Sequence, residues 1–265
     1  MLLATIAFVG SADAKELLIG QASPGEARLP LDQIEHTPWH TLLQRFVDSE
    51  GRVNYRSWHA DTGARAALTS YLESLGPVEL EAAAPIEAAL AYWINAYNAL
   101  TIEGILREYP TSSIRNHTAT VWGYNLWKDL KLRVADSTVS LDDIEHQRLR
   151  PRGDPRIHFA IVCASIGCPR LLNEAYRPET LEAQLEMNAR HFFAQSQNFQ
   201  IDPASNTIHL SAILKWYGED FGATQDQRLR RITQWLPTNA ARSLMTQPNA
   251  RVSYLEYDWH LNEQP

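Results

Sequence analysis

Residues 85–110 read PIEAALAYWINAYNALTIEGILREYP, and this stretch decides the fold. Its apolar side chains recur at helical spacing and cover much of the circumference, which is typical of a helix that is buried on most sides. Pro110 ends the pattern, because proline has no backbone N–H to donate and its ring obstructs the preceding turn. The sequence therefore predicts a long, largely buried central helix from about Pro85 to Tyr109.

Shorter elements are predicted on both sides of this helix. Two segments alternate around turn residues and indicate hairpins, and a continuous apolar run, Arg156–Cys163, indicates a buried strand. The predicted helices cover residues 62–75, 142–149, 179–195, 211–217 and 224–236, with one more that starts at Thr37; the hairpins cover 130–141 and 199–210, and a last strand covers 251–257. Together they predict a single domain of the α+β class, in which a small, mostly antiparallel sheet packs with several helices around the central helix.

The composition excludes several classes of protein. Hydrophobic residues make up 45% of the 265 residues and charged residues 21%, which excludes a disordered or collagen-like chain. The net charge of −7 provides no general attraction for nucleic acid, so we expect no nucleic-acid partner. No stretch reaches the roughly 18 consecutive apolar residues of a membrane span. We expect a globular protein whose ligand is a small molecule or a peptide.

The N-terminus has the pattern of a secretory signal peptide. The apolar run Met1–Val9 is followed by Ala12-Asp13-Ala14, which fits an A-x-A cleavage site, although no Lys or Arg precedes the run. The alternative is an apolar N-terminal strand or a disordered start. We expect residues 1–14 to be removed and the mature protein to be periplasmic or secreted. Residues 15–50 then form an N-terminal extension with the first helix, and residues 51–262 form the main domain.

Reactive side chains concentrate between Asp142 and Pro169. This segment holds both cysteines of the chain, two histidines and several carboxylates. A cysteine nucleophile with a histidine base is the chemistry that such a set can perform, provided that the side chains converge. The spacing Cys163-x4-Cys168 lacks the close pairs of common zinc sites, so we expect no metal. No cofactor is expected either, because neither a Walker A nor a G-x-G-x-x-G pattern occurs.

Cys168 is the better placed of the two thiols. It lies between Gly167 and Pro169, and proline is favoured at the first residue of a helix, so we expect Cys168 at a helix N-cap that stabilises the thiolate. Cys163 ends the predicted strand, where a free cysteine is usually a small buried hydrophobic residue. In an exported protein a Cys163–Cys168 disulfide is equally consistent with the sequence, because its formation depends on a Cα separation that the sequence does not give.

His146 is the better candidate for the base. Asp142 precedes it by four residues and shares its helical face, whereas Glu145 points about 100° away. The alternative is that His146 is an exposed or capping histidine near the end of a helix. His158 lies five residues before Cys163, which would place the two on opposite faces of a strand. We therefore expect a buried, hydrogen-bonded His158.

Two asparagines interrupt the apolar pattern of the central helix. Asn95 is a candidate for orienting a catalytic histidine, as in Cys-His-Asn arrangements. Asn95 and Asn98 have a second interpretation, because buried asparagines more often bind neighbouring backbone. Near the C-terminus, Tyr254, Tyr257 and Trp259 flank an apolar strand and are predicted to belong to the core.

Five strings coincide along the chain, namely Ala91–Leu100, Ser140–His146, His158–Pro169, Lys215–Phe221 and Tyr257–Asn262. Their combination resembles the domain of unknown function 547 family over roughly Gly51 to Asn262. The family's motif residues match at Asn95, Glu145, His146, His158, Cys163, Cys168 and Pro169. The resemblance implies an exported bacterial protein or, in plants, a domain attached to a leucine-zipper segment. It points to Asp142–Pro169 as the site without implying a reaction.

The residues leave three functions open. The first is a thiol-dependent hydrolase or acyltransferase of an exported protein, acting on an amide or a thioester, with a cysteine as nucleophile and a histidine as base. Its catalytic residues would come from Cys168, Cys163, His146, Glu145, Asp142, Asn95 and His158. The second is a non-enzymatic periplasmic binding or scaffold domain with a structural Cys163–Cys168 disulfide. The third is a thiol–disulfide redox protein, although its spacing differs from CxxC.

Overall fold

The computed structural model describes residues 17–21, 27–118, 125–245 and 250–265. The predicted signal peptide, residues 1–14, lies outside the described residues. Within the described ranges, no helix combines the length and the apolar character needed to cross a membrane.

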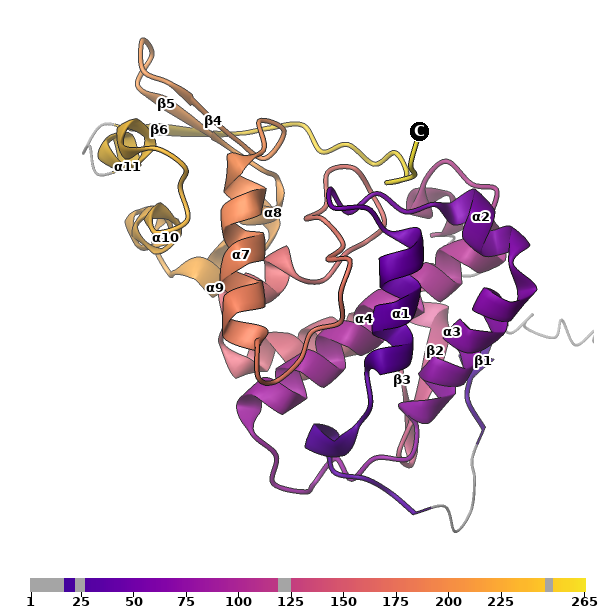
Figure 1. Cartoon of the computed structure of the whole chain (residues 1–265). Helices are drawn as coiled ribbons and strands as arrows, with labels where there is room; N and C mark the ends of the chain where they lie inside the picture. Colours follow the sequence, from indigo (N-terminus) through magenta and orange to yellow (C-terminus); the bar gives the residue numbers. More distant parts are fainter. Residues whose placement is uncertain (1–16, 22–26, 119–124, 246–249) are drawn as a thin grey trace, which may run out of the picture.

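Helix α4 (Ile86–Glu108) confirms the predicted central helix. Every residue from Ala88 to Leu106 is buried, as the apolar circumference predicted. The helix crosses the middle of the molecule, with α1–α3 on one side and α7 (Leu181–Ala194) on the other (Figure 1). Helices α1 (Thr37–Phe46), α2 (Tyr55–Ala60) and α3 (Thr62–Ser74) form the N-terminal layer.

Both predicted hairpins are present, and each belongs to its own small sheet. Strands β2 (Leu130–Val134) and β3 (Ser137–Val139) pair antiparallel, and β1 (Leu17–Ile19) adds to β2 in parallel. Strands β4 (Phe199–Asp202) and β5 (Thr207–Leu210) form the second hairpin, and β6 (Arg251–Tyr254) adds to β5 in parallel. The α+β class is confirmed, with the strands divided between two three-stranded sheets, each of which has one antiparallel and one parallel pair.

Short helices connect these parts. They are η1 (Leu31–Gln33), η2 (Ile114–His117), α5 (Leu126–Asp129), α6 (Leu141–Asp143), the π-helical turn η3 (Ile144–Leu149), η4 (Arg150–Arg152), η5 (Pro155–Phe159), α8 (Ile213–Trp216), α9 (Gly218–Phe221), α10 (Gln225–Thr233) and α11 (Asn239–Met245). Helix α6 begins with a capping box, in which the Ser140 hydroxyl accepts from the Asp143 N–H and the Asp143 carboxylate accepts from the Ser140 N–H. This box fixes the start of the segment that carries Asp142, Glu145 and His146.

The buried apolar residues form two clusters. The larger one surrounds α4, and the smaller one lies between α7, α10 and the second sheet, around Phe159 and Trp235. After β6 the chain returns from the second sheet to the N-terminal layer beside α2 (Figure 1). Near the end of this segment, the side-chain oxygen of Asn262 accepts a hydrogen bond from the Tyr55 hydroxyl at 2.9 Å, which joins the segment to α2. Tyr257 lies on this returning segment and packs against both clusters.

The predicted strand Arg156–Cys163 is wrong. Asp154 caps the helical turn η5 by accepting from the Arg156 N–H, and Pro155 occupies its first position, so the run begins as a helix. No strand in the described part of the chain pairs with the extended residues that follow, and Asn98 of α4 binds their backbone instead. Its side chain donates to the Ala160 carbonyl at 2.9 Å and accepts from the Val162 N–H at 3.0 Å.

Candidate functional site

The two thiols lie on a loop, residues 163–168, that the C-terminal segment holds in place. Backbone hydrogen bonds join Ile166 to His260 and Gly167 to Asp258, both at 2.8 Å. Gly167 favours this approach, because a Cβ there would lie only 3.0 Å from the ring of Tyr257 and from the backbone nitrogen of Asp258. The loop and the returning segment therefore fix each other's position.

Cys168 is not at a helix N-cap, and that prediction is wrong. The first helix after Pro169 in the described chain is α7, which begins at Leu181. Cys163, which was expected to be buried, is half-buried, and Cys168 is buried. The thiolate of Cys168 must therefore be stabilised by something other than a helix terminus.

Local hydrogen-bond donors surround the sulfur of Cys168. Its Sγ accepts from the backbone N–H of Cys163 at 2.9 Å, from the Tyr257 hydroxyl at 3.1 Å and from the Ser165 hydroxyl at 3.5 Å. The Cys163 Sγ contacts the same two hydroxyls, at 3.2 Å for Tyr257 and 3.0 Å for Ser165. Both cysteines are free in the structure. The two thiols thus share one hydroxyl pair.

These contacts make the two thiols unequal as acids. Burial of Cys168 opposes the thiolate, but hydrogen bonds from the Cys163 thiol, the Tyr257 and Ser165 hydroxyls and the Cys163 backbone outweigh it and lower the pKa of Cys168 to about 6. The hydrogen bond to Cys168, together with burial, raises the pKa of Cys163 well above its usual value. These two directions favour a proton on Cys163 and the negative charge on Cys168.

A cavity of about 290 Å³ opens beside both thiols. It lies where the two apolar clusters meet, because its walls come from α4, from the segment 126–169, from α8 and from the returning C-terminal segment. The lining residues are Tyr97, Trp127, Glu145, His158, Ile161, Cys163, Cys168, Pro169, Ile213, Trp216, Tyr217, Tyr257 and Trp259. The size suits a small ligand or the reacting end of a larger one.

Glu145 is the carboxylate of this cavity. It lies on η3 and is only 6% exposed. Its Oε2 accepts from the Tyr97 hydroxyl at 3.5 Å, and its Oε1 is buried without a hydrogen-bond partner among the described residues. A buried polar atom without a partner is costly, so such atoms commonly mark a ligand or functional site.

His146 lies next to Glu145 in sequence but is not among the cavity-lining residues. Its side chain is 41% exposed and lies 3.8 Å from the Asp142 carboxylate, as expected for side chains on one helical face. Its Nδ1 also lies 3.2 Å from Nη1 of Arg150. The predicted Asp142–His146 pair is therefore formed, but the structure does not bring it together with the thiols.

His158 lines the cavity and is buried and hydrogen-bonded, as expected. Its Nε2 lies 2.7 Å from the Asp220 carboxylate, and its ring stacks on Tyr217 with a centroid distance of 4.2 Å. Burial of Asp220 is outweighed by hydrogen bonds from His158 and Arg150, which hold the pKa of that carboxyl well below its usual range. The opposite-face argument for His158 and Cys163 fails because the strand it assumed is absent. Both residues line one cavity.

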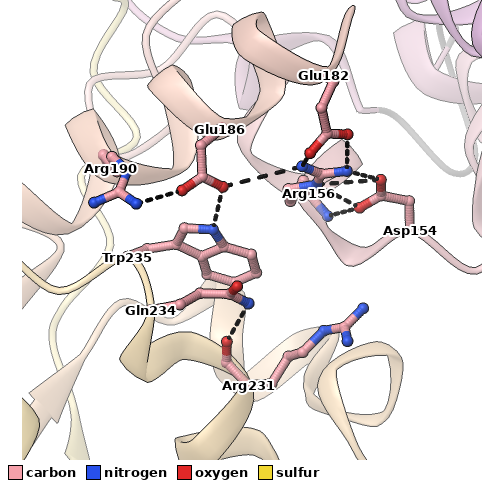
Figure 2. Close-up of polar contacts among 8 residues, drawn as sticks. All are labelled: Asp154, Arg156, Glu182, Glu186, Arg190, Arg231, Gln234 and Trp235. Carbon is pink, nitrogen blue, oxygen red and sulfur yellow. Dashed lines mark hydrogen bonds and ion pairs between the residues drawn. The ribbon is translucent and has the colours of Figure 1, made fainter.

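An ion-pair cluster anchors η5, the turn that carries His158. Arg156 lies between Asp154 on its own turn and Glu182 on α7, at 2.7 and 2.6 Å (Figure 2). Glu186 continues the cluster by accepting from the indole N–H of Trp235 at 2.9 Å. These contacts link the cavity wall to the second apolar cluster.

Asn95 has a structural role rather than the orienting role that was one of its two interpretations. Its side chain donates to the Tyr176 carbonyl at 2.8 Å and accepts from the Tyr176 N–H at 2.9 Å. Asn98 makes the equivalent pair of bonds just before Cys163. Both asparagines therefore bind neighbouring backbone through one donated and one accepted hydrogen bond, as a paired strand would. This agrees with the second interpretation, that they bind backbone.

Several residues of the site were missed by the sequence analysis. Ser165, Asp220 and Tyr257 were not proposed as site residues, and Tyr257 was predicted to be a core residue. The signal was nevertheless present, because Lys215–Phe221 and Tyr257–Asn262 are two of the strings that carry the family resemblance. Among the described residues, no group of three or more His, Cys, Asp or Glu side chains is arranged to hold a metal ion.

Residues 83–193 match the family described as "Protein of unknown function, DUF547". The chain thus resembles this family, and the matched part includes α4, Glu145, His158 and both thiols. The match does not extend to Tyr217, Tyr257 or the other cavity residues that follow α7. Neither a curated protein nor a solved structure matches the chain.

Proposed function

We propose that the protein is a thiol-dependent hydrolase or acyltransferase in which Cys168 attacks the carbonyl carbon of an amide or a thioester. The observation that carries this proposal is the Cys168 sulfur, which accepts from the Cys163 N–H at 2.9 Å and from the Tyr257 hydroxyl at 3.1 Å beside a ligand-sized cavity. These donors favour the thiolate, which is the nucleophilic form of cysteine. Removal of the thiol proton by a separate base is then unnecessary at neutral pH.

In the proposed reaction, a C–S bond forms between Cys168 and the carbonyl carbon, and the C=O electron pair moves onto oxygen. When that pair returns, the bond to the amine or thiol leaving group breaks and the leaving group takes a proton from an acid of the cavity. Water, or an acceptor in a transferase, then attacks the thioester, returns a proton to that acid and releases Cys168 as thiolate.

Glu145 and His158 are the two cavity groups that can carry this proton. One carboxylate oxygen of Glu145 accepts no hydrogen bond from the residues that the structure describes. His158 is oriented by Asp220, much as a catalytic histidine is oriented by an acidic partner. The proposal therefore moves the proton-transfer role from His146, whose ring lies outside the cavity lining, to these two residues.

Acylation by p-nitrophenyl acetate tests the proposal. We expect a burst of p-nitrophenolate and one acetyl group on the peptide that contains Cys168, as measured by mass spectrometry. Cys168→Ser should abolish both, whereas Cys163→Ser should retain them, because the serine hydroxyl can donate in place of the thiol and the backbone N–H of residue 163 remains. An unmodified Cys168 in protein with two free thiols would contradict the proposed chemistry.

A non-enzymatic periplasmic binding or scaffold domain is the second candidate. The observation in its favour is that both sulfurs contact the same hydroxyls of Ser165 and Tyr257, so the thiols lie side by side. Purified exported protein with no titratable thiol would favour a structural Cys163–Cys168 disulfide, and thiol counts that vary with redox conditions would favour the redox hypothesis. N-terminal sequencing tests export, since we expect residues 1–14 to be absent.

A further inference from the structure

We propose that the cavity beside Cys168 binds the part of the substrate that carries an ammonium group. The inference rests on the proposed acyl transfer for its place in a reaction, whereas the binding of the cation can be measured without any reaction. Three features of the cavity support it: its aromatic walls, its buried carboxylate and the absence of Lys and Arg from its described lining.

Aromatic side chains make up almost half of the cavity lining. Six of the thirteen lining residues are tyrosine or tryptophan, namely Tyr97, Trp127, Trp216, Tyr217, Tyr257 and Trp259. Three of these rings pack together, with centroid distances of 4.9 Å for Trp216–Tyr257, 5.8 Å for Trp216–Trp259 and 4.5 Å for Tyr257–Trp259. The faces of such rings attract cations, and several rings around one site are the usual device for binding ammonium groups.

Glu145 supplies a negative charge within these aromatic walls. Its carboxylate is nearly fully buried, and in the described part of the chain Oε1 has no hydrogen-bond partner. A buried carboxylate is stabilised by a cation, but none of the described lining residues is Lys or Arg. A positively charged ligand group would therefore supply the partner that the protein does not.

Two arginines, Arg150 and Arg115, lie over aromatic rings that line the cavity. Arg150 lies over Tyr217 but is paired with Asp220 and Glu219, at 2.7 Å each. Arg115 lies 5.2 Å from the ring centroid of Trp259. Neither residue lines the cavity. Glu145 and the Cys168 thiolate are left as negative groups facing the same space, which disfavours an anionic ligand and favours a cationic one.

Calorimetric titration with choline, compared with its neutral isostere 3,3-dimethyl-1-butanol, tests this inference. The two molecules have nearly the same shape and differ in charge, so their difference in affinity measures the preference for a cation. We expect choline to bind the wild-type protein at least about tenfold more tightly than the neutral alcohol. Equal affinity, or no binding of choline, would overturn the inference.

Single substitutions test whether choline binds in this cavity. Glu145→Gln and Trp216→Ala should each weaken choline binding several-fold, whereas Glu50→Gln should not, because Glu50 is exposed and lines a different hollow. Trp216 is 47% exposed, so its truncation should leave the fold intact if Glu145→Gln proves unstable. Unchanged binding in both cavity variants would also contradict the inference.

The outcome is separable from that of the proposed function. Cys168→Ser should still bind choline, because the aromatic walls and Glu145 remain. If choline binds but the wild-type protein is not acylated, the proposed acyl transfer is contradicted and the cation-binding cavity is supported. If Cys168 is acylated but choline does not bind, the acyl transfer is supported and the preference for a cation is contradicted.

Discussion

The hydroxyl of Tyr257 donates a hydrogen bond to the sulfur of Cys168 at 3.1 Å, across 89 residues of sequence. Tyr257 also lies on the segment that pairs with the thiol loop and packs against both apolar clusters. The acidity of Cys168 therefore depends on the docking of the C-terminal segment. A change in either residue should be measurable at the other.

Substitution of Tyr257 by phenylalanine should raise the pKa of Cys168. A hydrogen bond to a charged group contributes about 1.5–3 kcal/mol, which corresponds to about one to two pH units. We expect alkylation of Cys168 at pH 7 to slow several-fold, with little change in melting temperature, because the aromatic ring remains. Tyr254→Phe is the matched control, since Tyr254 is 40% exposed. Alkylation profiles that are identical in wild type and Tyr257→Phe would rule out this role for the hydroxyl.

Asn98→Ala should both destabilise the protein and disturb the thiols. It leaves the Ala160 carbonyl and the Val162 N–H buried without their partner, at a cost of about 2–6 kcal/mol for the two groups. Because Val162 precedes Cys163, the N–H donor to Cys168 should also shift. Urea unfolding measures the first effect and the rate of alkylation the second.

Asn95→Ala is the control for this variant. Asn95 makes the same two kinds of bond to the backbone of Tyr176, away from the thiol loop. We expect a similar loss of stability but an unchanged alkylation rate. If both variants slowed alkylation equally, the effect would follow from general destabilisation and not from the position of the Cys163 backbone.

The lowered pKa of His36 should make the stability of the folded protein fall in mild acid. Burial, and then the positive charge of Arg177, lowers its pKa to about 4, and its Nδ1 lies 2.8 Å from the Tyr71 hydroxyl. Between pH 6.5 and 4, His36 binds a proton in the unfolded chain but not in the folded protein. The contribution of His36 to the free energy of unfolding is therefore fully present above pH 6.5 and falls as the pH drops. The expected loss is about 3 kcal/mol.

Urea unfolding at a series of pH values measures this loss. His36→Gln should flatten the dependence between pH 6.5 and 4. A smaller slope should remain, because burial and the charge of Arg170 also lower the pKa of His191. A His36→Gln protein with the wild-type slope would show that this histidine is not the cause.

Local sequence patterns predicted much of the fold. The apolar circumference of residues 86–108 predicted α4, and the turn residues between apolar pairs predicted the two hairpins. The run 156–163 was misread because a buried apolar segment has the same composition whether its backbone bonds to a strand or to a side chain such as Asn98. The division of the strands between two sheets depends on β1 and β6, which are distant in sequence from the strands they join.

The candidate site was predicted in part. Clustering of reactive residues indicated the region that holds Glu145, His158 and both thiols. The choice of His146 over Glu145 could not be corrected from the sequence, because adjacent helical residues differ only in the direction in which they point. Tyr257 could not be assigned either, since its hydroxyl reaches Cys168 only after the chain has returned from the second sheet.

The rate of alkylation of native, reduced protein by iodoacetamide as a function of pH, mapped to each cysteine, tests the central claim that Cys168 is a thiolate at neutral pH. Because the pKa of Cys168 is lowered to about 6, we expect its rate to reach half-maximum near pH 6 and to be constant above pH 7, while Cys163 reacts slowly throughout. Cys163→Ser should retain this profile and Cys168→Ser should abolish it. A Cys168 rate that continues to rise up to pH 9, or alkylation of Cys163 alone, would contradict the claim.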